Sequence, residues 1–283
     1  MANLKEIRNR ISSVSSTMQI TSAMKMVSAA KLKKAQDAIT AMRPYSNKLT
    51  AILQSLSSSL NSDNKFAVTR DINNVLVVSI TSNRGLCGGF NSNVLKKSYE
   101  LAKTTYKDSN VSFVAIGKKG NDFLSKSFNV VSNRSDVFDN LSISLVSEIA
   151  DLLMLKFTNQ EFDKIILVYN KFKNAATQIV VEEQFLPIEK IEESNSSTDY
   201  IFEPSKVEII EELIPKSLKN QLFKAIRDSW ASEHGARMTA MHKATDNATE
   251  LRDQLKLAYN QARQAAITNE ILEIVGGAEA LNN

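Results

Sequence analysis

Apolar residues in the first 60 positions of the chain recur at alternating steps of three and four residues. Such a 3.5-residue repeat is typical of a helix that packs along one seam against another helix. The repeat keeps a single phase, and all but four of its positions are apolar: Leu4, Ile7, Ile11, Val14, Met18, Thr21, Lys25, Ser28, Leu32, Ala35, Ile39, Met42, Ser46, Leu49, Leu53, Leu56 and Leu60. The pattern predicts a coiled-coil helix over residues 1–62, kinked or re-capped at Pro44.

The seam weakens between Thr21 and Ser28, where Ile20, Met24 and Val27 shift onto a neighbouring line of the helix. One interpretation is that small polar residues relieve crowding inside the coiled coil. The other is that this stretch faces something besides its helical partner. On the pattern alone we favour the first interpretation and keep the second as the alternative.

A second long helix is predicted over residues 205–283, with a different packing surface. Small residues on one ridge let another helix approach closely. Alanines recur every fourth residue here, at Ala236, Ala240, Ala244 and Ala248, then at Ala258, Ala262 and Ala266. Because the two helices flank a globular middle, they must return antiparallel. The two ends therefore predict one long antiparallel two-helix coiled coil.

The last segment, from Ala265 to Leu281, has apolar side chains on more than one face of its helix. A helix that is apolar all round is normally buried. Because this segment lies at the end of a rod, we expect the surface that buries it to belong to another chain.

The middle of the chain alternates between strand and helix patterns. This alternation is typical of an α/β domain with a largely parallel sheet, assigned here to residues 73–204. Strands are predicted at residues 74–81, 111–117, 164–169 and 177–185, and helices at 91–106 and 140–158.

A glycine-rich segment, residues 82–90, follows the first strand and opens a helix. Loops in that position cradle phosphates in many nucleotide-binding proteins. The segment contains neither Gly-Lys-Ser/Thr nor G-x-G-x-x-G, and no acidic residue is placed to hold a ribose. A tight turn that needs glycines explains the segment as well. We favour the structural interpretation and keep an α/β nucleotide-binding enzyme with coiled-coil arms as the alternative.

The remaining reactive side chains form no recognisable active site. His234 and His242 have no cluster of further ligands beside them, so neither a metal nor a cofactor is expected. Cys87 has no histidine in its own domain to activate it. As the single cysteine it excludes an internal disulfide and fits a reducing compartment. No apolar run approaches the roughly 20 residues that cross a bilayer.

The net charge of +4 hides an uneven distribution. Lys and Arg dominate residues 1–50, whereas Asp and Glu dominate residues 182–212. This asymmetry indicates partners of opposite sign at different places on the molecule. The basic residues are spread around a helix without interleaved aromatics, so nucleic acid is not the expected partner.

Several stretches resemble the gamma subunits of F-type ATP synthases. The resemblance runs in order over essentially the whole chain, so it is far more specific than any single motif. It covers residues 7–14 (Ile-Arg-Asn-Arg-Ile-Ser-Ser-Val), 19–31, 82–89 (Ser-Asn-Arg-Gly-Leu-Cys-Gly-Gly), 232–241, 244–248 and 262–278.

The resemblance implies a non-catalytic rotor with a Rossmann-like central domain between paired terminal helices. In this family the shaft turns inside a hexamer of alpha and beta subunits, and the central domain forms a foot with epsilon on a ring of c subunits. Ion flow turns the ring, and the asymmetric shaft drives each catalytic beta subunit through its conformations in turn. One copy per complex is expected, peripheral to the membrane on the cytoplasmic face of a bacterial inner membrane.

Functional positions carry over onto matching residues. The resemblance assigns hexamer contacts to Met24, Arg237, Gln264, Thr268 and Glu270. It assigns contacts with the c ring and epsilon to Tyr200, Phe202 and Glu203; Phe202 stands where many members have tyrosine.

A third interpretation of the chain is a generic coiled-coil tether. This interpretation would leave the apolar C-terminal tip unexplained.

Overall fold

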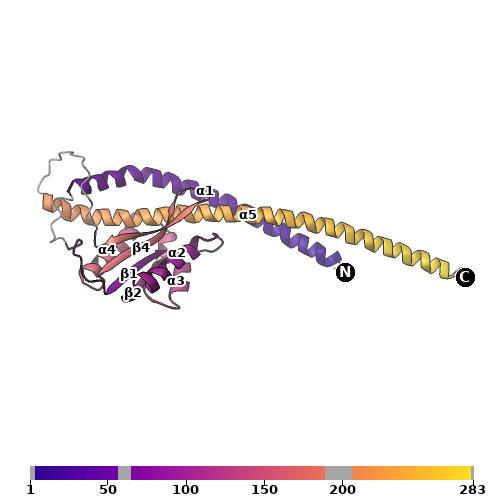
Figure 1. The fold of residues 1–283 in the computed structure, drawn as a ribbon. Helices are drawn as coiled ribbons and strands as arrows, with labels where there is room; N and C mark the ends of the chain where they lie inside the picture. Colours follow the sequence, from indigo (N-terminus) through magenta and orange to yellow (C-terminus); the bar gives the residue numbers. More distant parts are fainter. Residues whose placement is uncertain (1–3, 57–64, 189–205, 282–283) are drawn as a thin grey trace. The chain divides into compact units, whose positions relative to one another are not determined.

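A computed structural model describes residues 4–56, 65–188 and 206–281 of the chain. These residues fall into two compact units. The first, the helix-pair unit, combines Met1–Ser28 with Met238–Asn283; the second, the sheet unit, spans Ala29–Arg237. The expected fold class, an α/β domain with two long terminal helices, is confirmed (Figure 1).

Each terminal helix is continuous and passes through both units. Helix α1 spans Leu4–Leu56 and contains Pro44, and helix α5 spans Lys206–Leu281 and contains Pro215. The structure therefore contains both predicted long helices. The division of the chain into functional segments at residues 1–62, 73–204 and 205–283 stays a prediction.

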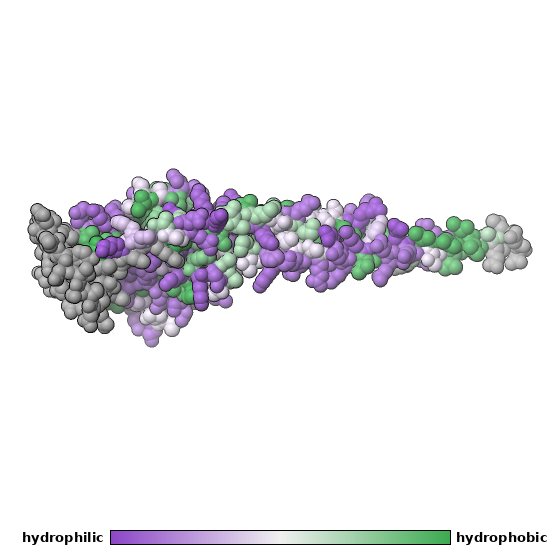
Figure 2. All heavy atoms as spheres, turned by 90° about the horizontal axis from the view of Figure 1, so that it is seen from above, coloured by the Kyte–Doolittle hydropathy of each residue, from purple (hydrophilic) through white to green (hydrophobic). Residues whose placement is uncertain are grey.

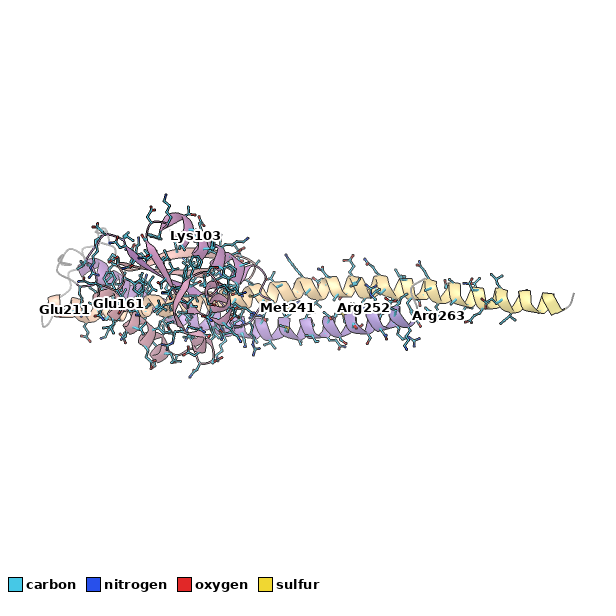
Figure 3. The ribbon with its side chains drawn as sticks, turned by 90° about the horizontal axis from the view of Figure 1, so that it is seen from below. Lys103, Glu161, Glu211, Met241, Arg252 and Arg263 are labelled. Atoms are coloured by element: carbon cyan, nitrogen blue, oxygen red, sulfur yellow. The ribbon has the colours of Figure 1, made fainter. Side chains whose placement is uncertain are left out.

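In the helix-pair unit the two helices lie side by side and run antiparallel (Figures 1 and 3). Residue numbers on α5 fall as those on α1 rise. The guanidinium of Arg8 donates to the hydroxyl of Tyr259 over 2.8 Å, that of Arg252 contacts the sulfur of Met18 at 3.5 Å, and Lys25 Nζ lies 3.3 Å from Nδ1 of His242. The antiparallel coiled coil is thus present in this unit.

From Leu4 to Leu49, burial on α1 follows the predicted 3.5-residue repeat. The side chains of Leu53, Leu56 and Leu60 lie outside the described residues. Ile7, Thr21 and Ser28 are buried in the helix-pair unit, and Leu32, Ala35 and Ile39 continue the same line in the sheet unit. Small hydroxyl side chains therefore occupy the seam where it was predicted to weaken. The neighbouring apolar side chains stay outside it: Ile20 is 60% exposed and Val27 is 57% exposed.

The predicted alanine ridge of α5 is confirmed except at Ala258. Ala258 is exposed, whereas the other six alanines are buried or half-buried: Ala236, Ala240, Ala244, Ala248, Ala262 and Ala266. The inward line continues instead through Arg252, Leu255 and Tyr259, which are less exposed than their neighbours. A coiled-coil seam repeats every 3.5 residues, so a row spaced by four drifts off it.

The sheet unit contains one five-stranded sheet in the order β3-β2-β1-β4-β5. Its first four strands are parallel, and β5 pairs antiparallel with β4. The strands are β1 Asn74–Ile80, β2 Asn110–Ile116, β3 Asn129–Asn133, β4 Lys164–Phe172 and β5 Gln178–Leu186. The largely parallel sheet is confirmed. Strand β3, which was not predicted, is a short edge strand with mostly polar residues, so it lacks the apolar run of a buried strand.

Two layers of helix cover the sheet. Leu76, Val78 and Ile80 of β1 face helix α4 (Ile143–Thr158) and the first part of α5. Val75 and Val77 face helix α2 (Phe90–Glu100), which continues as a π-helical turn Leu101–Thr105, and helix α3 (Lys118–Leu124). A 3-10 turn spans Ser135–Phe138. Side chains alternate across a strand, so β1 contributes residues to the hydrophobic cores on both faces of the sheet.

Candidate functional site

The carboxyl ends of β1 and β4 meet at the point where the chain changes direction across the sheet. In open α/β sheets, ligands bind in the crevice beyond such strand ends. The glycine-rich loop after β1 borders this crevice, and it bends through two left-handed residues, Leu86 (φ 62°) and Gly88 (φ 58°). This is therefore the place to test the nucleotide-binding alternative.

Helix α5 fills this crevice with its own side chains. The hydroxyl of Ser232 donates to the carbonyl of Asn170 at 3.0 Å, and the amide of Asn170 donates to the carbonyl of Phe90, also at 3.0 Å. Gly235 lets the helix approach the turn after β4, since a Cβ at this position would lie 3.2 Å from the carbonyl oxygen of Ala175. The space that holds a ligand in related architectures is occupied here by the chain itself.

Arg237 and Glu233 form a buried ion pair above the same loop. Arg237 Nη1 lies 2.6 Å from Glu233 Oε1, and both side chains are 9% exposed. Arg237 Nη2 also donates to the carbonyls of Arg84 at 2.9 Å and Gly85 at 3.2 Å. Burial raises the pKa of the Glu233 carboxyl, although Arg237 opposes the rise. The predicted contact of Arg237 with a hexamer stays a prediction, and its guanidinium is engaged within this chain.

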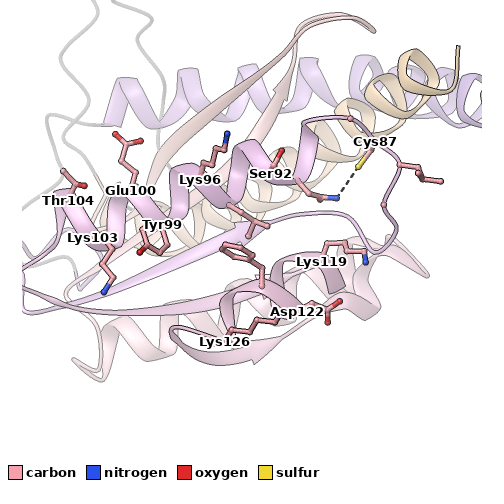
Figure 4. Close-up of a pocket in the computed structure, with 16 residues that line it drawn as sticks. Cys87, Ser92, Lys96, Tyr99, Glu100, Lys103, Thr104, Lys119, Asp122 and Lys126 are labelled. Atoms are coloured by element: carbon pink, nitrogen blue, oxygen red, sulfur yellow. Dashed lines mark hydrogen bonds between the residues drawn. The ribbon is translucent and has the colours of Figure 1, made fainter. Parts of the chain in front are cut away.

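A groove of about 930 Å³ lies between α2 and α3 on the other side of the glycine-rich loop (Figure 4). Its rim includes Lys96, Lys103, Lys119 and Lys126, with Tyr99 and Phe123 among its walls. Cys87 lies at one end, buried, and burial raises the pKa of its thiol. A protonated buried thiol is a poor nucleophile, so the groove contains no activated group of that kind.

Met24 lies on α1 in the helix-pair unit and is half-buried. Ile20 and Val27, four residues before it and three residues after it, lie on the same side of the helix and are 60% and 57% exposed. Ile20, Met24 and Val27 form what we call the α1 apolar stripe. The stripe supports the second interpretation of the weakened seam, in which this stretch faces a further partner.

Gln264, Thr268 and Glu270 are exposed along the distal part of α5. The Thr268 hydroxyl donates to the Gln264 carbonyl at 2.9 Å, so both lie on one side of the helix. Beyond Arg263 helix α5 runs without α1 beside it (Figure 3). Its tip is apolar and exposed (Figure 2), with Ile267, Ile271, Leu272, Ile274 and Val275 in contact with solvent.

Tyr200, Phe202 and Glu203 lie outside the described residues. Within residues 4–56, 65–188 and 206–281, no three His, Cys, Asp or Glu side chains gather where they could hold a metal ion. In the same ranges no helix is both long and apolar enough to span a bilayer.

Sequence reasoning missed the residues of α5 that enter the crevice, Ser232, Glu233 and Gly235. One signal was available, because an acid and an arginine four residues apart on a helix can pair. A glycine in the middle of a long helix is a second signal, since it costs about 1 kcal/mol relative to alanine unless close packing requires it.

Comparison with known proteins places these features in a family. The family model for ATP synthase, ATP-synt, matches residues 3–281. An ATP synthase gamma chain of Christiangramia forsetii is 65% identical over the full length of both chains, and one of Flavobacterium psychrophilum is 68% identical over 99% of each.

Solved structures share the fold. A chain of the mitochondrial ATP synthase of Euglena gracilis, from a structure of OSCP, F1 and c-ring, superposes with a TM-score of 0.74 at 24% identity, covering 98% of this chain and 94% of that one. A chain from the central stalk and c-ring of the Tetrahymena thermophila enzyme gives a TM-score of 0.61 at 25% identity, covering 80% of this chain and 99% of that one.

Proposed function

The chain belongs to the family of ATP synthase gamma chains, and we propose that it couples rotation of a c-subunit ring to the conformational cycling of catalytic beta subunits. A gamma chain is the central-stalk rotor subunit and is not itself catalytic. The observation that best supports the mechanism is the pair of antiparallel helices whose outer surface differs from side to side. One side of α1 exposes the apolar stripe, whereas α5 exposes charged residues at Lys243, Asp246, Glu250 and Asp253.

Asymmetry is what lets a turning shaft do work on its surroundings. A rotor that presented the same surface at every angle would favour no conformation of a neighbouring subunit over another. A ligand or partner shifts an equilibrium only through its different affinity for the two states. The stripe on α1 supplies such a difference, because each beta subunit would meet it at only one part of the turn.

We assign the contacts with the alpha and beta hexamer to Met24, Arg237, Gln264, Thr268 and Glu270. Exposure of the last three supports this assignment. The apolar tip of α5 would be buried in the hexamer, since a large exposed apolar surface usually marks an interface.

The foot of the rotor is proposed to be the central domain, residues 73–204, resting with epsilon on the c ring through Tyr200, Phe202 and Glu203. One copy per complex would lie on the cytoplasmic face of the bacterial inner membrane. The filled crevice at the ends of β1 and β4 argues against the nucleotide-binding alternative at that place.

Reconstitution tests this function. Alpha and beta subunits would be assembled with and without the chain, and ATP hydrolysis and ion pumping measured after addition of the membrane sector. We expect the chain to co-purify with the hexamer and to be required for pumping. Full pumping in its absence would exclude the rotor function.

A further inference from the structure

The contacts in the crevice join two parts of the molecule that a rotor must hold together. One is the sheet, which the proposed function places on the ring. The other is helix α5, which continues from the crevice to Leu281 as a single helix. Three contacts meet within two turns of that helix: Ser232 with Asn170, Gly235 with the turn at Ala175, and Arg237 with the loop after β1.

We propose that Ser232, Glu233, Gly235, Ala236 and Arg237 form a torque joint, a set of contacts that transmits rotation from the sheet to α5. The Glu233–Arg237 ion pair holds these contacts in place. This inference rests on the rotor function proposed above. In other open α/β sheets this crevice binds a ligand, whereas here it would transmit force between the sheet and a helix.

The Glu233–Arg237 ion pair holds the glycine-rich loop through the loop's backbone carbonyls. Arg237 donates to the two carbonyls that immediately precede Leu86, a non-glycine residue in the left-handed region. Such a conformation persists only where the surrounding structure fixes it. Ala236 packs against Cys87 and Phe90 on the inner side of the same loop. The loop is therefore held from both its carbonyls and its buried side chains.

The Glu233 carboxylate supplies the negative charge that this joint needs beside its basic side chains. It pairs with Arg237 and also attracts Lys31 and Arg84. Removing one partner of a buried ion pair leaves the other uncompensated, which is strongly destabilising. Neutralising Glu233 would therefore loosen the loop and Arg237, which is also one of the hexamer contacts assigned above, whereas a change at Ser232 leaves the Arg237 pair in place.

The joint can be tested in the whole complex by comparing ion pumping with ATP hydrolysis. We expect Glu233→Gln combined with Ser232→Ala to lower the ions pumped per ATP by at least about twofold, because buried pairing and hydrogen bonding in the joint are lost. Hydrolysis by the hexamer should change less. Ser232→Ala alone, which removes one hydrogen bond, should give a smaller loss in the same direction.

Glu212→Gln is the matched control. Glu212 pairs with Lys216 over the same 2.6 Å and the same four-residue spacing on α5, but both side chains are exposed. This variant should pump as the wild type does, because exposed pairs contribute little.

A covalent link provides a rescue. Ala236→Cys places a thiol beside Cys87, and copper phenanthroline would oxidise the two to a disulfide that dithiothreitol reverses. In the Glu233→Gln background the oxidised form should recover pumping and the reduced form should lose it again. A merely structural role for Glu233 would lower thermal stability but would not make the pumping ratio respond to this link.

The joint is overturned if assembled Ser232→Ala and Glu233→Gln complexes pump as many ions per ATP as the wild type. Failure of the rotor function itself looks different, since the wild-type chain would then not be needed for pumping.

Discussion

The hydroxyl oxygens of Thr21 and Thr245 lie 2.8 Å apart in the seam of the helix pair, although 224 positions separate them in the sequence. Each hydroxyl also contacts a carbonyl of its own helix, at Met18 and Met241 respectively. A polar pair in an apolar seam fixes the register of two helices at some expense in stability. This pair therefore sets how the two ends of the chain align in the helix-pair unit.

A double-mutant cycle should measure this pairing. We expect Thr21→Val and Thr245→Val to show a coupling free energy of about 1 kcal/mol in the stability of the chain, because each single change leaves the other hydroxyl without its cross-helix partner. Denaturant unfolding gives the four values. Thr17 and Thr249 serve as control, since each bonds only to its own helix and their coupling should be near zero.

The α1 apolar stripe should matter in the complex and not in the isolated chain. Val27→Lys changes an exposed residue, so the free energy of unfolding of the isolated chain should move by no more than about 0.5 kcal/mol. In the complex the buried charge should lower coupling between hydrolysis and pumping. Gln19→Lys adds the same charge at an exposed polar position and should leave coupling intact. Equal effects of the two variants would show that the stripe has no special role.

His234 should make stability depend on pH. Burial, followed by repulsion from Arg237 and Lys31, lowers its pKa from 6.5 to about 3, and neither ring nitrogen has a hydrogen-bond partner. The unfolded chain therefore binds the proton more readily. The stabilisation is complete above pH 6.5 and is lost as the pH falls toward 3. Between pH 7 and pH 5 the wild type should lose about 2 kcal/mol relative to His234→Gln. Parallel pH profiles for the two chains would contradict this assignment.

Gly117 should tolerate no side chain. Its φ of 112° is open essentially to glycine alone, and a Cβ there would overlap the carbonyl oxygen of Thr81. Gly117→Ala is expected to cost about 3 kcal/mol or more in the free energy of unfolding. Gly85→Ala, where a Cβ meets nothing within 4 Å, should cost less than about 1 kcal/mol. Equal costs, measured by denaturant unfolding, would rule out the close approach at Gly117.

The elements predicted best were those with long periodic patterns. From Leu4 to Leu49 the seam of α1 could be predicted position by position, because every residue of a coiled-coil repeat meets the same partner. The short strand β3 and helix α3 could not, since five or seven residues hold too little pattern. The crevice contacts also escaped prediction. The glycine at 235 and the spacing of Glu233 and Arg237 were visible in the sequence, but only the sheet topology shows that this part of α5 meets the loop after β1 and the end of β4.

Observation of single complexes shows directly whether this chain rotates within the hexamer. A bead would be attached to Lys107→Cys, an exposed position on the sheet unit, in a Cys87→Ser background, with the hexamer fixed to a surface. We expect ATP to drive the bead continuously in one direction. Complexes that hydrolyse ATP at the usual rate while the bead stays at a fixed angle would contradict this expectation.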